Sequence, residues 1–213
     1  KTYSPEDQTY NKTYYYPTLS MAYEATHSFD SAILIEERLS SLTASDDINT
    51  RLETQYRLAT LYLKQGDLLQ ANKLSSAYLK YHIANSAPSS PEIFKALIAR
   101  ADYFFAANLP DSAFHFYTRS LKTIDGGLTI DNLAEKVSEA QISAHLLPRV
   151  MAAMEKIAIA IVSEEYVSTE RLTNGLSMLE ATLAYTRYNS PYGPEERVVL
   201  DRIASFHLLT EYA

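Results

Sequence analysis

Two pairs of ionisable side chains have spacings that could support chemistry, and the first would bind a metal. Glu24 and His27 form an E-x-x-H segment, a spacing that supplies carboxylate and imidazole ligands in di-iron helical bundles. Such a site also needs a second E-x-x-H segment and two further acids. None of the other four histidines has an acid three residues before it. The sequence therefore predicts no metal site and no cofactor.

The second pair is Asp111 and His115, which are four residues apart and could share one helix face as an acid and a base. The simpler interpretation is that Asp111 stabilises the first turn of a helix and that His115 is an ordinary surface or partly buried side chain. The chain has no G-x-S-x-G, S-x-x-K or H-E-x-x-H motif and no glycine-rich phosphate loop. We therefore expect no enzymatic activity.

Composition narrows the possible partners. The 213 residues carry a formal charge of −7 and include no cysteine, so disulfides and thiol catalysis are excluded. The basic residues are scattered singly, whereas nucleic-acid binding needs them clustered. The longest apolar run, 157–162, is far shorter than the ~20 residues of a membrane span. These features predict a soluble segment, cytoplasmic or facing the cell envelope, that binds no nucleic acid directly and does not insert into a membrane.

The elements that position the side chains are predicted to be helices. Only 5 glycines and 8 prolines are present, too few for the frequent turns of an all-β sandwich or barrel. Apolar residues recur with a period of 3.6, for example at Val150, Met154, Ile157 and Ile161. The β-branched run at 157–162 lies inside this longer pattern, so we interpret it as buried helix. The sequence predicts an all-α fold of about nine or ten helices.

An internal repeat organises these helices. Related phrases occur at residues 28–33, 66–71 and 108–113, and each contains an alanine that anchors the alignment. The anchoring alanines are 39 and 42 residues apart, and a small residue followed three positions later by an aromatic lies upstream of each. The repeated positions are Ser20, Tyr23 and Ala32, then Ala59, Tyr62 and Ala71, then Ala101, Phe104 and Ala113. This pattern resembles the tetratricopeptide (TPR) repeat.

The resemblance implies antiparallel helix pairs that stack into a superhelical array. The small residues would lie where paired helices cross closely, and the aromatic residues would fill the space between units. We expect a single helical-repeat domain over 1–213, with units at about 13–43, 52–86 and 92–125 and divergent helices over 128–213. Glu36, Ser75 and Arg100 depart from the family pattern, because aromatic or apolar residues are usual at these positions.

The repeat register also indicates which positions of each unit face the concave side of the array. They are Tyr14, Pro17, Met21 and Glu24, then Glu53, Tyr56, Thr60 and Lys64, then Lys95, Ile98, Asp102 and Phe105. No Lys–Asn carboxylate clamp is present among them, and the set is a mixture of aromatic and polar residues. The resemblance therefore implies a non-enzymatic scaffold or adaptor that binds a protein or peptide in this groove. The alternative is the ligand- or peptide-sensing region of a larger signalling or transcription regulator, anchored in a membrane outside this segment.

The last predicted helix, at about 194–211, has more apolar surface than one packed face requires. Its additional apolar residues are Val198, Val199, Phe206, Leu208 and Leu209. We hypothesise that this helix is a junction covered by further chain, by a second copy or by a partner.

Overall fold

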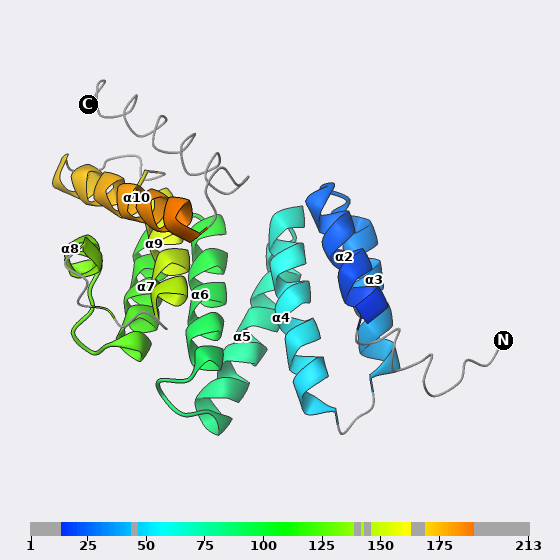
Figure 1. Cartoon of the computed structure of the whole chain (residues 1–213). Helices are drawn as coiled ribbons and strands as arrows, with labels where there is room; N and C mark the ends of the chain where they lie inside the picture. The colour runs from blue at the N-terminus through cyan, green and yellow to red at the C-terminus, as the bar shows by residue number, and fades with distance from the viewer. Residues whose placement is uncertain (1–13, 44–46, 139–141, 143–145, 163–168, 190–213) are drawn as a thin grey trace. The chain divides into compact units, whose positions relative to one another are not determined.

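The computed structural model describes residues 14–43, 47–138, 142, 146–162 and 169–189. All regular structure within these ranges is helical (Figure 1), which confirms the predicted all-α fold. The helices are α2 (Tyr16–Ala25), α3 (Phe29–Leu42), α4 (Ile48–Gln65), α5 (Leu68–Asn85), α6 (Pro91–Ala106), α7 (Pro110–Ile124), α8 (Leu133–Ser138), α9 (Leu147–Val162) and α10 (Thr169–Asn189). The chain divides into two compact units, residues 1–87 and 88–213.

The first unit contains two helix pairs. Helix α2 packs on α3, α3 packs on α4, and α4 packs on α5. One cluster of its core is formed by Ala32, Ile33, Leu58 and Leu61, which come from α3 and α4. Ala71, Tyr78 and Leu79 of α5 are buried as well. The half-buried side chains of the repeat aromatics pack against this core from the ends of α2 and α4.

The second unit contains one further pair, α6 and α7, followed by the more divergent helices α8 to α10. Helix α9 packs on α7 and on α10, and the short α8 packs on α10. Val150, Met154, Ile157 and Ile161 of α9 are each at most 1% exposed. The β-branched run is therefore a buried helix, as the surrounding period indicates.

The same turn joins the helices of all three pairs. The backbone N–H groups of Ser28, Asp67 and Leu109 donate to the carbonyls of Tyr23, Tyr62 and Phe104, each at 2.9 Å. The residue before each donor adopts the left-handed conformation, with φ of 56° at His27, 91° at Gly66 and 57° at Asn108. This is the Schellman arrangement that closes a helix C-terminus. The left-handed residue lies five positions before the anchoring alanine in each case. The backbone conformation of the turn therefore repeats together with the side-chain pattern.

A substitution at Gly66 changes only the backbone preference of this turn, because a Cβ built there meets no atom within 4 Å. We expect Gly66→Ala to lower the free energy of unfolding by about 1 kcal/mol, since an L-residue is strained in the left-handed region. We expect Gly66→Asn to cost less, because asparagine tolerates this conformation and already occupies it at Asn108. Urea unfolding followed by circular dichroism measures both changes. Equal stability of the glycine and alanine proteins would contradict this account.

Capping residues explain where several of these helices begin. The carboxylates of Asp47 and Asp67 accept from the N–H groups of Thr50 and Gln70 at the starts of α4 and α5, at 3.1 and 3.0 Å. Ser90 caps α6 by accepting from the N–H of Ile93 at 3.3 Å, and Pro91 follows as the first helical residue. These side chains satisfy donors that have no partner within the helix.

The small residues of the repeat pattern are all buried. Ser20, Ala32, Ala59, Ala71, Ala101 and Ala113 are between 0% and 4% exposed. No helix among the described residues has the length and apolar content to cross a bilayer. The hypothesised junction helix at 194–211 lies outside the described residues.

Candidate binding surface

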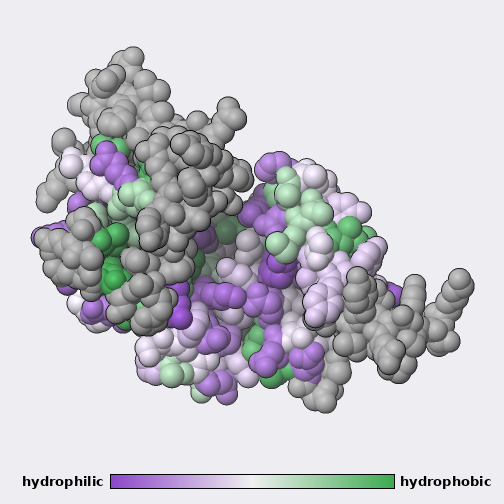
Figure 2. Space-filling model, in the orientation of Figure 1, coloured by the Kyte–Doolittle hydropathy of each residue, from purple (hydrophilic) through white to green (hydrophobic). Residues whose placement is uncertain are grey.

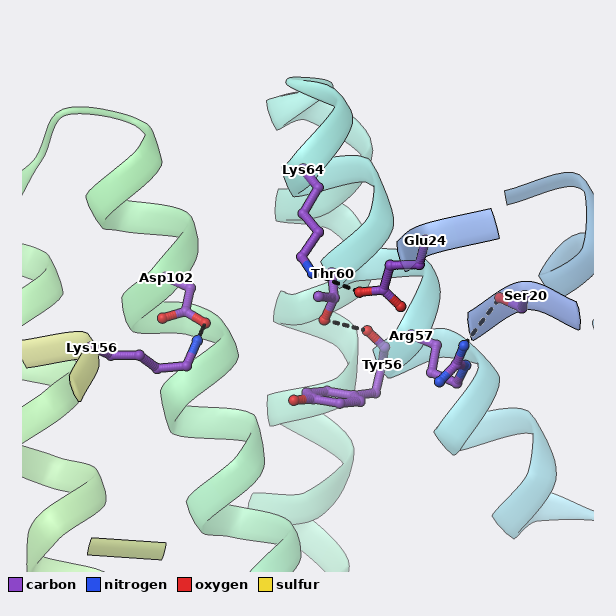
Figure 3. A network of polar contacts seen from close by, with 8 residues as sticks. All are labelled: Ser20, Glu24, Tyr56, Arg57, Thr60, Lys64, Asp102 and Lys156. Atoms are coloured by element: carbon purple, nitrogen blue, oxygen red, sulfur yellow. Dashed lines mark hydrogen bonds and ion pairs between the residues drawn. The ribbon is translucent and has the colours of Figure 1, made fainter. Parts of the chain in front are cut away.

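Long polar side chains connect the first helices of the two pairs in the first unit (Figure 3). Arg57 of α4 donates from Nη2 to the hydroxyl of Ser20 on α2 at 3.0 Å. One helical turn further along α2, Glu24 forms an ion pair with Lys64 of α4 at 2.6 Å. Contacts follow the same direction along both helices, so α2 and α4 run parallel. This hydrogen bond and this ion pair hold α2 and α4 next to each other.

Arg57 also pairs with a fully buried acid. Glu36 of α3 is 0% exposed, and its Oε1 accepts from Arg57 Nε at 2.5 Å. Its other carboxylate oxygen, Oε2, is buried and makes no hydrogen bond. A buried carboxylate is costly unless it is paired, so the guanidinium of Arg57 compensates Glu36 while its Nη2 contacts α2.

The sequence-predicted groove residues of the first unit lie on the same two helices as these polar contacts. Tyr14 and Met21 are 62% and 58% exposed, and Lys64 is exposed beside Glu24. Tyr56 is half-buried, with its ring centroid 5.5 Å from that of Tyr78 on α5. The Thr60 hydroxyl donates to the Tyr56 carbonyl at 3.1 Å. Two further predicted positions complete the set, with Pro17 half-buried and Glu53 exposed.

In the second unit, three of the four predicted groove residues contact other residues of the unit, namely Ile98, Asp102 and Phe105. Ile98 is 6% exposed and belongs to the core. Asp102 accepts from the hydroxyl of Tyr117 on α7 at 2.9 Å and pairs with Lys156 of α9. Phe105 is half-buried against the same core, and Lys95 is exposed. Helix α9 thus reaches the face of α6 that the repeat register assigns to a partner.

The Tyr117–Asp102 hydrogen bond gives a pH-dependent prediction. Burial, and then the nearby Asp102 carboxylate, raise the pKa of Tyr117 far above its ordinary value of 10.0. Because the pKa is raised in the folded state, the contribution of Tyr117 to the free energy of unfolding is complete below pH 10. It is lost as the pH rises above 10, where the tyrosine of the unfolded chain ionises. We expect Tyr117→Phe to cost about 1 kcal/mol at pH 7 and to reduce the loss of stability between pH 7 and about pH 10.5. Urea midpoints of both proteins at the two pH values test this, and identical pH slopes would contradict it.

Arg100 replaces the apolar residue that the repeat pattern favours. It is 9% exposed, and its guanidinium carbon lies 4.9 Å from the ring centroid of Tyr103 and 4.7 Å from that of Phe104. Burial lowers the pKa of Arg100 from its ordinary value. Because aromatic faces attract cations, Arg100 packs as part of the aromatic cluster of α6 and α7.

Neither the Glu24/His27 pair, with its metal-binding spacing, nor the Asp111/His115 pair, with its acid–base spacing, lies in an enclosed site. Glu24 pairs with Lys64, and His27 lies exposed in the left-handed turn with its ring against Phe29. Asp111 and His115 are both exposed on α7, and the His115 ring contacts Phe116. No group of three or more potential metal-ligating His, Cys, Asp or Glu residues gathers within the described ranges.

A cleft of about 530 Å³ lies between α10 and the segment around α8. Its lining includes three exposed carboxylate residues, two neutral polar residues and two alanines: Asp131, Glu135, Glu180, Asn174, Ser177, Ala134 and Ala181. The cleft is open and polar.

Sequence reasoning did not identify Arg57 or Lys156, although both hold acids on other helices. One signal pointed to Arg57. An acid at position 36, where the repeat favours an aromatic residue, requires a cation on an adjacent helix if it is buried. Lys156 gave no such signal, because it lies on α9, beyond the part of the chain where the repeat pattern is readable.

Comparison with known proteins gives a fold. Neither a protein-family profile nor a curated protein sequence matches the chain. Among solved structures, the nearly identical TPR-like repeats assigned to a kinesin light chain from Podosopora anserina are similar. The TM-score is 0.51 at 15% identity, covering 93% of this chain and 96% of that one. A variant of the same repeats gives a TM-score of 0.53 at 14% identity, covering 99% and 100%. This protein has a TPR-like helical-repeat fold.

Proposed function

We propose that the chain is a protein- or peptide-binding module and that its first unit carries the binding surface on α2 and α4. The proposed contact residues there are Tyr14, Met21, Tyr56, Thr60 and Lys64. Lys95 and Phe105 of α6 are separate proposed contact residues of the second unit, where Ile98 and Asp102 contact other residues of that unit. A stacked helical-repeat fold supports this proposal because it presents extended surfaces for binding.

The pairing of two cations on α4, Arg57 and Lys64, is the observation that carries the proposal. Arg57 and Lys64 are already paired with Glu36 and Glu24. The proposed contacts Tyr14, Met21, Tyr56 and Thr60 carry aromatic, thioether or hydroxyl groups, which suit packing and a few hydrogen bonds. The predicted groove set also includes the exposed acid Glu53. We therefore propose that the partner is held mainly by packing, without a dominant ion pair to a terminal carboxylate.

A displayed library of random 12-residue peptides, selected on the immobilised protein, tests this proposal. We expect peptides with micromolar dissociation constants, enriched in apolar residues. Thr60→Arg should weaken their binding at least ~10-fold, which is about 1.4 kcal/mol, because it places a large cation in the centre of the α4 face. Isothermal titration with individual peptides measures the change.

Ser76→Arg is the matched control, because Ser76 is an exposed hydroxyl residue on the neighbouring α5. The selected peptides should bind the Ser76→Arg protein as tightly as they bind the unchanged protein. Selected peptides that are insensitive to Thr60→Arg would place the binding surface elsewhere. A library that yields no specific peptide would refute the peptide-binding form of the proposal.

A further inference from the structure

The exposed face of the first helix has an unusual composition. Six residues of the segment 14–25 are exposed, namely Tyr14, Tyr15, Thr18, Met21, Ala22 and Ala25. At about 100° per residue they occupy one arc of about 120°. Tyr15 has helical backbone angles, with φ of −68° and ψ of −55°, so the face is continuous from the preceding turn into α2. Three large side chains on it, Tyr14, Tyr15 and Met21, are each more than half exposed.

This face carries no Asp, Glu, Lys, Arg or His, although the whole chain has a formal charge of −7. The only charged residue of α2, Glu24, lies off this face and is paired with Lys64 of α4. Figure 2 shows the pale colours of intermediate hydropathy over α2, in contrast to the deep purple of neighbouring hydrophilic residues. A face that carries tyrosine and methionine without charged residues has the composition of an interface centre.

Charge and shape together favour a second copy of this chain as the occupant. A two-fold interface brings the same surface of each copy together, so two acidic chains meet with least repulsion at a face without charges. The face is also graded in size, with two tyrosines at its N-terminal end and two alanines at its C-terminal end. Antiparallel pairing therefore places large side chains against small ones at both ends.

We propose that α2 is a homodimerisation helix, with two copies packed antiparallel about a two-fold axis that crosses the exposed face at the level of residues 19 and 20. In this register Tyr14 of one copy lies beside Ala25 of the second copy, and Thr18 lies beside Met21. The inference goes beyond the proposed peptide-binding function, since it needs no foreign partner. Tyr14 and Met21 are also proposed peptide contacts, so a second copy and a peptide compete for these two side chains. Tyr56, Thr60 and Lys64 lie outside the proposed dimer interface. One helix face buries less than the ~800 Å² per partner of standard stable complexes, so the dimer is weak, with a dissociation constant in the micromolar range.

Sedimentation velocity between about 5 and 300 μM measures the association. The mass should rise with concentration from the chain mass of 24.0 kDa towards twice that value. Met21→Asp places two carboxylates near the axis and should keep the protein monomeric throughout the range. Leu34→Asp is the matched control, since Leu34 is 65% exposed on α3 and its replacement should leave dimerisation unchanged. Circular dichroism verifies that both variants keep their helix content.

Disulfide trapping tests the register, because the chain contains no cysteine of its own. Under mild oxidation, a mixture of Tyr14→Cys and Ala25→Cys proteins should form covalent dimers at least ~10-fold faster than either protein alone. Leu69→Cys, at a 77% exposed position on α5, gives the background rate. A wild-type protein that stays monomeric at 300 μM overturns the proposal, and so does a mass that Met21→Asp does not change. Trapping of Tyr14→Cys with itself as fast as in the mixture overturns the antiparallel register. None of these outcomes affects the peptide-library result for Thr60→Arg.

Discussion

Arg57→Ala should lower the free energy of unfolding of the first unit by about 3–5 kcal/mol, the cost of removing one partner of a buried ion pair. The substitution leaves Glu36, which is 0% exposed, without the guanidinium that holds its Oε1. It also removes the donor to Ser20 on α2. Urea unfolding followed by circular dichroism should show an early loss of the helix signal of this unit.

The double variant Glu36→Met with Arg57→Met separates charge pairing from packing. Replacing both members of a buried pair by apolar side chains of similar volume is often close to neutral, so this protein should recover most of the stability lost in Arg57→Ala. Arg51→Ala is the surface control, because Arg51 is exposed on the same helix. If Arg57→Ala lowers the free energy of unfolding no more than Arg51→Ala does, the Arg57–Glu36 ion pair does not stabilise this unit.

Ala71→Leu and Ala113→Leu should each destabilise their own unit by about 1–3 kcal/mol through overpacking. Ala71 is 1% exposed and Ala113 is 0% exposed. Each occupies the same place in its pair, five residues after the left-handed turn. Three added carbon atoms at such a crossing must displace the facing helix or force a strained rotamer.

Thermal melting of each variant measures the effect, and Ala84→Leu provides the control at an exposed alanine near the end of α5. The control should melt within a degree or two of the unchanged protein. Unchanged melting of both core variants would mean that the anchoring alanines do not lie at close crossings, and the repeat register would then be wrong.

Much of the fold could be predicted from the sequence, because the signals are local. The period of apolar residues predicted helix even through the β-branched run of α9. The small and aromatic repeat positions predicted where helices pair. The turn residues His27, Gly66 and Asn108 lie at matching places in three helix pairs, because each helix end needs the same backbone closure. These features depend on residues that lie within one helix or one helix pair.

The partners of the polar side chains were decided by the tertiary structure alone. Arg57 meets Glu36 and Ser20 across 21 and 37 residues, and Lys156 meets Asp102 across 54. Such pairs depend on which helices lie next to each other and at what depth, which periodicity does not encode. The same reason explains why Ile98 and Asp102, predicted to face a groove, contact their own unit. The sequence by itself determined helices, turns and repeat register, whereas packing between helices decided which charges are neutralised and which face of α2 stays exposed.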